Sequence, residues 1–220
     1  MSRRGPPVAG VLFDCYGTLI DILTDERDIR TYQCLSRWLL YQGVRIAPER
    51  LRACYAGRVR EAADRTGERH PEVRVEEVFV GICAEHSIWE IDTARLGAEA
   101  ARAFRAASIR RLGVIEESRR LLDLFGTEKT GAVSNGQRVF SEQEMRAFGL
   151  YDRLDFVIFS SDLGYQKPDQ RIYAAALDRM GLQAPDVLFI GDNFKNDVDA
   201  PRQIGMQALH VEEAWKRYGT

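Results

Sequence analysis

The chain has 220 residues, with 31 basic and 33 acidic side chains and therefore a formal net charge of −2. Hydrophobic residues make up 45% and charged residues 29%, which excludes a disordered or fibrous chain and is typical of a globular one. A charge balance this even argues against a dedicated nucleic-acid binder, which carries a basic excess. A small anionic substrate is still compatible with it, because a pocket needs only a few local donors.

The cysteines and the hydropathy pattern bear on the compartment. Cys15, Cys34, Cys54 and Cys83 form no C-x-x-C pair, so we expect reduced thiols rather than a zinc site or a disulfide framework. The basic segment 1–7 precedes an apolar run that is too short for a signal peptide or a membrane span. We expect a soluble, cytoplasmic protein without a membrane partner, and the sequence leaves its oligomeric state open.

The first predicted element is a buried strand over Val8–Phe13, a continuous apolar run that ends abruptly at Asp14. From about residue 25 to residue 107, apolar residues recur instead at three- and four-residue offsets, which is typical of amphipathic helices. These helices are expected around Leu35–Tyr41, Leu51–Val59 and Val75–Ile82, with breakers around Gly43–Pro48, Gly67–Pro71 and Gly97.

After Ala107 the pattern alternates between helices and strands. Helices are predicted over Glu116–Phe125, Phe140–Phe148, Ile172–Met180 and about Asn196–Gly205, and strands over Thr130–Val133, Phe156–Phe159, Val187–Ile190 and Gln207–Val211. Such βα units predict an α/β fold with a doubly wound parallel sheet. Residues 1–21 and 108–220 would form this sheet region, and residues 22–107 would form a helical insertion.

Polar residues follow four of the predicted strands, where ligands bind in parallel sheets. The four segments are Asp14-Cys-Tyr16-Gly17-Thr18, Ser134-Asn135-Gly136, Lys167-Pro168-Asp169 and Gly191-Asp192 with Asp197 beyond it. Each segment alone is also typical of a turn or a helix cap. Their occurrence in order at one edge of the sheet favours a functional site.

These residue types suit a displacement reaction on phosphorus or on an activated carbon. A carboxylate such as Asp14 is a competent nucleophile that forms a covalent intermediate, which water then hydrolyses. A divalent cation held by Asp14 and Asp192 would remove the repulsion between this carboxylate and an anionic substrate. Lys167 would supply positive charge, and the Thr18 and Ser134 hydroxyls would hold the non-bridging oxygens.

Together these four segments resemble the motifs of the haloacid dehalogenase-like hydrolases, and the resemblance covers nearly the whole chain. It implies a Rossmann-like core with an inserted α-helical cap domain that selects the substrate. It also implies Asp14 as the nucleophile and Mg²⁺ as the cofactor. The predicted metal ligands are Asp14, Asp192, Asp197 and the backbone carbonyl of Tyr16, and the predicted substrate-binding residues are Tyr16, Gly17, Asn135 and Gly136.

Tyr16 departs from the pattern of the phosphatases in this family, which have an acidic residue two positions after the nucleophile. The Asp-x-Tyr-Gly-Thr form resembles the 2-haloacid dehalogenases. Tyr173, six residues after Lys167, suits them too, but many phosphatases of the family also have an aromatic residue there. Asp192 and Asp197 instead match the metal-dependent form, and two carboxylates held together without a cation would be costly.

The sequence therefore predicts a Mg²⁺-dependent phosphatase of a small phosphorylated metabolite. One alternative is a 2-haloacid dehalogenase that forms an ester on Asp14. The other is a catalytically weak protein that retains the fold as a binding scaffold.

Overall fold

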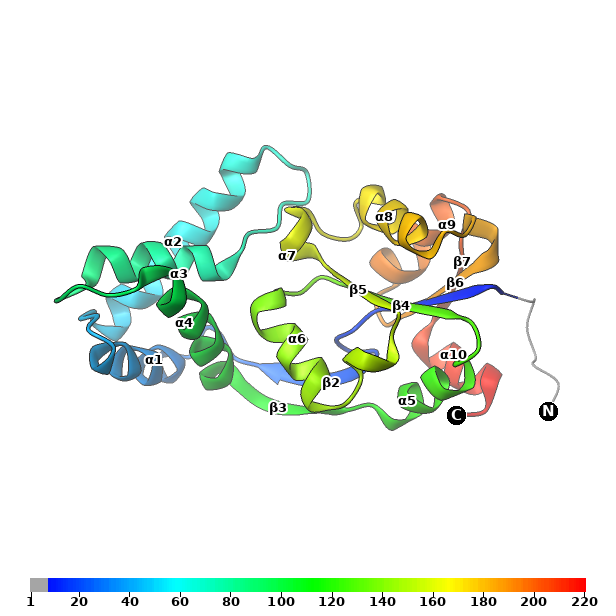
Figure 1. Ribbon diagram of the computed structural model, residues 1–220, viewed down its shortest axis with the longest axis horizontal. Coiled ribbons are helices and arrows are strands. Elements are labelled where there is room, and N and C mark those ends of the chain that lie inside the picture. The colour runs from blue at the N-terminus through cyan, green and yellow to red at the C-terminus, as the bar shows by residue number, and fades with distance from the viewer. Residues whose placement is uncertain (1–7) are drawn as a thin grey trace.

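Five strands form a parallel sheet in the order β5-β4-β1-β6-β7 in the computed structural model, which describes residues 8–220 (Figure 1). Their bounds are β1 (Gly10–Phe13), β4 (Lys129–Ser134), β5 (Phe156–Phe159), β6 (Val187–Gly191) and β7 (Gln207–His210). All four neighbouring pairs are parallel, which confirms the predicted sheet. The basic segment 1–7 lies outside the described residues.

Helices cover both faces of this sheet (Figure 1). One side carries α5 (Glu116–Leu124), α6 (Arg138–Ala147) and α10 (Val211–Tyr218), and the other carries α8 (Gln170–Met180) and α9 (Ala200–Gln203). The alternation of side chains along β1 explains how one strand serves both layers. Val11 and Phe13 pack with residues of α5, α6 and α10, whereas Leu12 packs with residues of α8 and α9.

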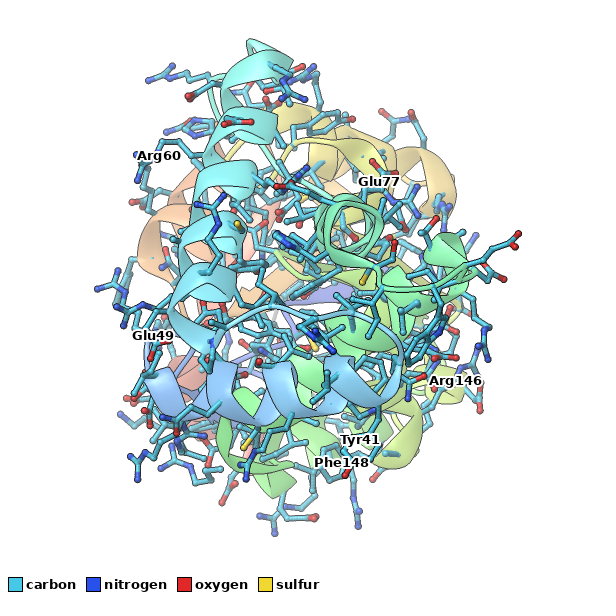
Figure 2. The ribbon with its side chains drawn as sticks, turned by 90° about the vertical axis from the view of Figure 1, so that its left-hand side faces the viewer. Tyr41, Glu49, Arg60, Glu77, Arg146 and Phe148 are labelled. Atoms are coloured by element: carbon cyan, nitrogen blue, oxygen red, sulfur yellow. The ribbon has the colours of Figure 1, made fainter. Side chains whose placement is uncertain are left out.

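Four helices form a separate block at one end of the molecule (Figure 1). They are α1 (Ile29–Tyr41), α2 (Pro48–Thr66), α3 (Val75–His86) and α4 (Thr93–Ser108), and we call them the cap helices. Leu35, Phe79 and Phe104 lie in their shared apolar cluster. Figure 2 turns this end toward the viewer and shows Glu49 and Arg60 on the outer, exposed side of α2. The exact division at residues 22 and 107 remains a prediction.

Several elements differ from the sequence prediction. An antiparallel pair, β2 (Ile20–Thr24) and β3 (Ile109–Val114), connects the cap helices to the sheet region, where no strands were expected. The helix predicted over Asn196–Gly205 is a π-helical turn, η3 (Phe194–Asp199), followed by α9. A short helix, α7 (Ser160–Leu163), follows β5, and single 3₁₀ turns occupy Tyr151–Arg153 and Ala184–Asp186.

Gly97 was expected to break a helix, and this prediction was wrong because Gly97 lies inside α4. A Cβ atom at Gly97 would lie 2.4 Å from Cγ2 of Val80 and 2.7 Å from the carbonyl oxygen of Glu76. Gly97 is therefore the point where α4 packs directly against α3.

We expect Gly97→Ala to destabilise the protein by about 1–3 kcal/mol, because the new methyl group overpacks the contact between α3 and α4. Gly57→Ala is the matched control, since Gly57 lies inside α2 and an added Cβ would meet no atom within 4 Å. That change should stabilise by roughly 0.5–1 kcal/mol through backbone entropy. Urea unfolding of both variants measures the difference, and equal effects would contradict the packing argument.

None of the helices within residues 8–220 has both the length and the apolar composition needed to cross a membrane. All four cysteines are free thiols. The expected cytoplasmic location stays a prediction.

Candidate active site

Asp14, Lys167 and Asp197 meet in a buried cluster at the carboxyl edge of the sheet. The Lys167 ammonium donates hydrogen bonds to Oδ1 of Asp14 at 2.6 Å and to Oδ1 of Asp197 at 2.7 Å. The Thr18 hydroxyl donates to the second oxygen of Asp14 at 3.2 Å. The structure therefore brings together residues from three motifs that lie far apart in the sequence.

Three carboxylates lie near this single ammonium group, and two of them, Asp14 and Asp197, contact it. Asp14, Asp192 and Asp197 each offer an oxygen atom, and the three atoms lie within 4.8 Å of one another. Burial raises the pKa of all three carboxyls, although Lys167 acts in the opposite direction. Burial also disfavours the ammonium form of Lys167, but Asp14 and Asp197 outweigh this effect and raise its pKa, so it stays charged.

The donor set of this cluster fits a magnesium ion. Asp14 and Asp197 are buried and Asp192 is exposed, so three carboxylates stand against one ammonium, and a divalent cation would offset this excess of negative charge. Carboxylate oxygens are also the ligands that Mg²⁺ prefers.

Two glycines allow the acidic side chains to approach so closely. Gly17 has a φ of +82°, and a Cβ atom there would lie 2.3 Å from Oδ2 of Asp192. A Cβ atom at Gly191 would lie 2.4 Å from that of Asp197. A larger residue at either position would displace a carboxylate, which explains why glycine is needed in both motifs.

The second motif contributes both a positioning residue and a free hydroxyl. The Asn135 amide donates to the carbonyl of Lys167 at 3.0 Å and accepts from the Lys167 backbone N–H at 2.7 Å. The Ser134 hydroxyl oxygen is buried and has no hydrogen-bond partner among residues 8–220. A buried polar group without a partner is costly, so Ser134 is suited to a ligand oxygen. A Cβ atom at Gly136 would lie 2.9 Å from the Ser134 hydroxyl oxygen, so glycine leaves space beside that hydroxyl.

Tyr16 does not use its hydroxyl as a free proton donor. The phenol donates to Oε2 of Glu144 at 2.5 Å and lies 2.7 Å from the Ser141 hydroxyl. Burial and the Glu144 carboxylate, together with Cys15, raise the pKa of Tyr16, so it releases a proton reluctantly. The predicted metal contact through the Tyr16 carbonyl stays a prediction.

Several residues that hold the motif residues in place were not predicted from the sequence. His210 contacts the carbonyl of Asp192 through Nε2 at 2.9 Å, and the Asn193 backbone N–H donates to Asp197 at 3.0 Å. Tyr173, expected to suit a dehalogenase, donates its hydroxyl to the carbonyl of Asn196. The contacts of His210 and Tyr173 join segments that are 18 and 23 residues apart, so no local pattern indicates them, whereas Asn193 and Asp197 are only four residues apart.

A family model for haloacid dehalogenase-like hydrolases matches residues 8–205. The chain belongs to this family. It is 30% identical over 83 residues to a glyceraldehyde 3-phosphate phosphatase from Methanothermobacter thermautotrophicus, and this alignment covers 38% of this chain and 37% of that protein. It is 35% identical over 79 residues to haloacid dehalogenase-like hydrolase domain-containing protein 3 from Danio rerio, which covers 36% and 32%. These matches span only about a third of each relative's length.

Solved structures of the haloacid dehalogenase-like family share the fold over nearly the whole chain. A 2-haloacid dehalogenase from Pseudomonas syringae pv. tomato has a TM-score of 0.62 at 21% identity, covering 91% of this chain and 85% of that one. A haloacid dehalogenase-like (HAD) phosphatase from Thermococcus onnurineus has a TM-score of 0.53 at 20% identity, and the match covers 91% of this chain and 84% of that one. The family and its hydrolase fold are therefore established, whereas the fold alone does not select between the two chemistries.

Proposed function

We propose that this protein is a Mg²⁺-dependent phosphatase that hydrolyses a small phosphorylated metabolite through an aspartyl-phosphate on Asp14. The observation that carries this proposal is the convergence of Asp14, Asp192 and Asp197 within 4.8 Å around one buried lysine. A hydrolase that displaced halide without a metal ion would have no use for the Asp192 carboxylate in addition to those of Asp14 and Asp197. The phosphatase relatives support the same choice.

In the first step of the proposed reaction, a carboxylate oxygen of Asp14 attacks phosphorus and the bond from phosphorus to the leaving oxygen breaks. Lys167, Thr18 and Ser134 hold the phosphoryl oxygens while this charge moves. Water then attacks the phosphorus of the aspartyl-phosphate and the bond from phosphorus to the Asp14 oxygen breaks, which restores the Asp14 carboxylate and releases inorganic phosphate, with one proton of the water passing to solvent. Mg²⁺ held by Asp14, Asp192 and Asp197 would offset the carboxylate charge and polarise the phosphoryl oxygens.

The leaving group receives little help with protonation in this mechanism. The position that carries the acid in related phosphatases is Tyr16, and its hydroxyl is bound to Glu144. We therefore propose that the substrate is one whose leaving oxygen departs without full protonation, such as an acyl phosphate or an aryl phosphate. A series of leaving groups should give rates that fall steeply as the pKa of the leaving alcohol rises.

A paired assay of phosphate and halide release tests the proposal. Acetyl phosphate should be hydrolysed with Mg²⁺, and EDTA should lower the rate on the order of 10³-fold, as expected when a divalent cation offsets the charge in such a site. Asp192→Asn should raise the Mg²⁺ concentration needed for half-maximal rate and should weaken the rise in melting temperature that Mg²⁺ produces.

The competing activity is hydrolysis of a 2-haloacid, which Tyr16 at the acid position favours. Chloride release from 2-chloropropionate that persists in EDTA, together with no phosphate release, would overturn the phosphatase proposal. Because the two products are distinct anions, one preparation of the protein decides between the reactions.

A further inference from the structure

The Tyr16 phenol belongs to a buried polar cluster that joins three parts of the chain. Glu144 of α6 accepts the phenolic hydrogen bond at 2.5 Å. Arg105 of α4 donates to the same carboxylate from Nε at 2.7 Å and from Nη2 at 3.2 Å. Tyr16 itself lies two residues after Asp14, in the loop that follows β1. The cluster therefore connects a cap helix to the loop that carries the proposed nucleophile.

Burial makes each member of this cluster depend on the others. The side chains of Arg105 and Glu144 are only 10% and 8% exposed. The Arg105 guanidinium carbon lies 5.1 Å from the ring centroid of Tyr16 and 4.7 Å from that of Phe140. A buried ion pair is tolerated when its geometry is good. Removing one partner destabilises the fold, because the remaining charge is buried and uncompensated.

Arg105 has one further acidic neighbour, and this neighbour is weaker. Glu26 lies at 4.0 Å from Nη1 of Arg105, and its side chain is 43% exposed. Water can solvate Glu26 if α4 moves, whereas the Glu144 carboxylate would keep, of its hydrogen bonds within residues 8–220, only the one from Tyr16. Displacement of α4 would therefore remove Arg105 from Glu144 and leave this buried carboxylate uncompensated. The Tyr16 phenol, which donates to the same carboxylate, connects this change to the loop after β1.

We propose that Arg105 and Glu144 are positioning residues that act through the Tyr16 phenol, so that docking of the cap helix α4 fixes the loop bearing Asp14. The coupling is reciprocal, so a ligand that orders this loop also favours docked α4. The kinetic part of this inference rests on the proposed phosphatase function. The structural part, the coupling of α4 to the loop, does not.

A double-mutant cycle of Arg105→Met and Tyr16→Phe tests the coupling by single-turnover phosphoryl transfer from acetyl phosphate. Each change alone should lower the transfer rate about tenfold, and the double variant should lose at most about threefold more than the slower single variant. Effects that multiply would overturn the proposal, because independent residues behave additively in free energy.

Arg102→Met is the matched control for the cap contact. Arg102 lies one helical turn before Arg105 on α4 and donates from Nε to the carbonyl of Val139 at 2.9 Å, without touching Tyr16. We expect this variant to transfer phosphate within about twofold of the wild type, because an exposed contact of this kind contributes little. If Arg102→Met reproduced the loss seen in Arg105→Met, general loosening of the cap would explain both and the proposal would fail.

Amide hydrogen exchange keeps the test independent of activity. The amides of Gly17, Leu19 and Ile20 are hydrogen-bonded within the loop, so their exchange reports on its order. Arg105→Lys and Glu144→Gln, which are the gentler changes if Arg105→Met does not fold, should each speed this exchange, and Arg102→Met should not. Unchanged exchange in both variants would refute the coupling. A protein inactive on acetyl phosphate whose loop still responds would refute only the proposed reaction.

Discussion

Replacing Asp14 by asparagine should reduce kcat on the order of 10⁴-fold or more, because the amide cannot form the covalent intermediate. The substitution keeps the size of the side chain and its place beside Lys167 and Thr18. Binding of the substrate should therefore survive, and KM should change far less than kcat. Phosphate release with Mg²⁺ present measures the effect.

Asp178→Asn is the control for Asp14→Asn. Asp178 is an exposed residue of α8, and its loss should leave kcat within about twofold of the wild type, as is usual for surface substitutions. If Asp14→Asn retained every measurable function, the protein would be a binding scaffold rather than a phosphatase, which is the second alternative from the sequence.

Replacing Lys167 by methionine should both abolish activity and destabilise the fold at neutral pH. The buried carboxylates of Asp14 and Asp197 would then lose the ammonium that both now contact, with the exposed Asp192 carboxylate beside them. Removing one partner of a buried ion pair costs about 3–5 kcal/mol. Urea unfolding at pH 7 without Mg²⁺ measures this cost, and added Mg²⁺ should recover part of it by binding only the folded state.

The pH dependence of the Lys167→Met variant has a definite sign. Burial already raises the pKa of Asp14, Asp192 and Asp197 above the ordinary value of 3.8, and loss of the ammonium raises it further. At pH values between the unfolded-state and the folded-state pKa, the folded state binds more protons than the unfolded state. The free energy of unfolding therefore falls as the pH rises through the folded-state pKa values. The variant should therefore gain stability, relative to the wild type, as the pH is lowered from neutral.

Lys129→Met is the matched control for Lys167→Met. Lys129 donates to the carbonyl of Met180 at 2.9 Å, and this hydrogen bond has no carboxylate partner. Its loss should cost about 1 kcal/mol, with no change in the direction of the pH dependence. A Lys167→Met variant as stable as the wild type at pH 7 would show that the carboxylates do not depend on the ammonium.

The sheet and the four motifs were predictable because each depends on a short stretch of sequence. Apolar runs such as Phe156–Phe159 mark buried strands, and the polar residues that follow them must lie at one edge of a parallel sheet. The antiparallel pair β2–β3 was not predicted, because its two strands are 84 residues apart and only partly buried. Pairing of this kind is set by tertiary contact and not by local pattern.

The cluster around Tyr16 shows the same limit and one missed signal. Glu144 stands four residues after Phe140 and four before Phe148, so it interrupts an apolar stripe of the predicted helix. A charged residue on such a stripe indicates a buried partner. That partner is Arg105, which lies in a different helix, α4. No spacing of residues along the sequence connects Arg105 with Glu144.

Trapping the covalent intermediate tests the central claim most directly. The protein is mixed with acetyl phosphate and Mg²⁺, quenched in acid, and reduced with borohydride, which converts an aspartyl-phosphate to homoserine. Mass spectrometry of the peptides should then find homoserine at position 14, and none in the Asp14→Asn variant. A modified residue elsewhere, or phosphate release with no trapped intermediate at position 14, would contradict the account.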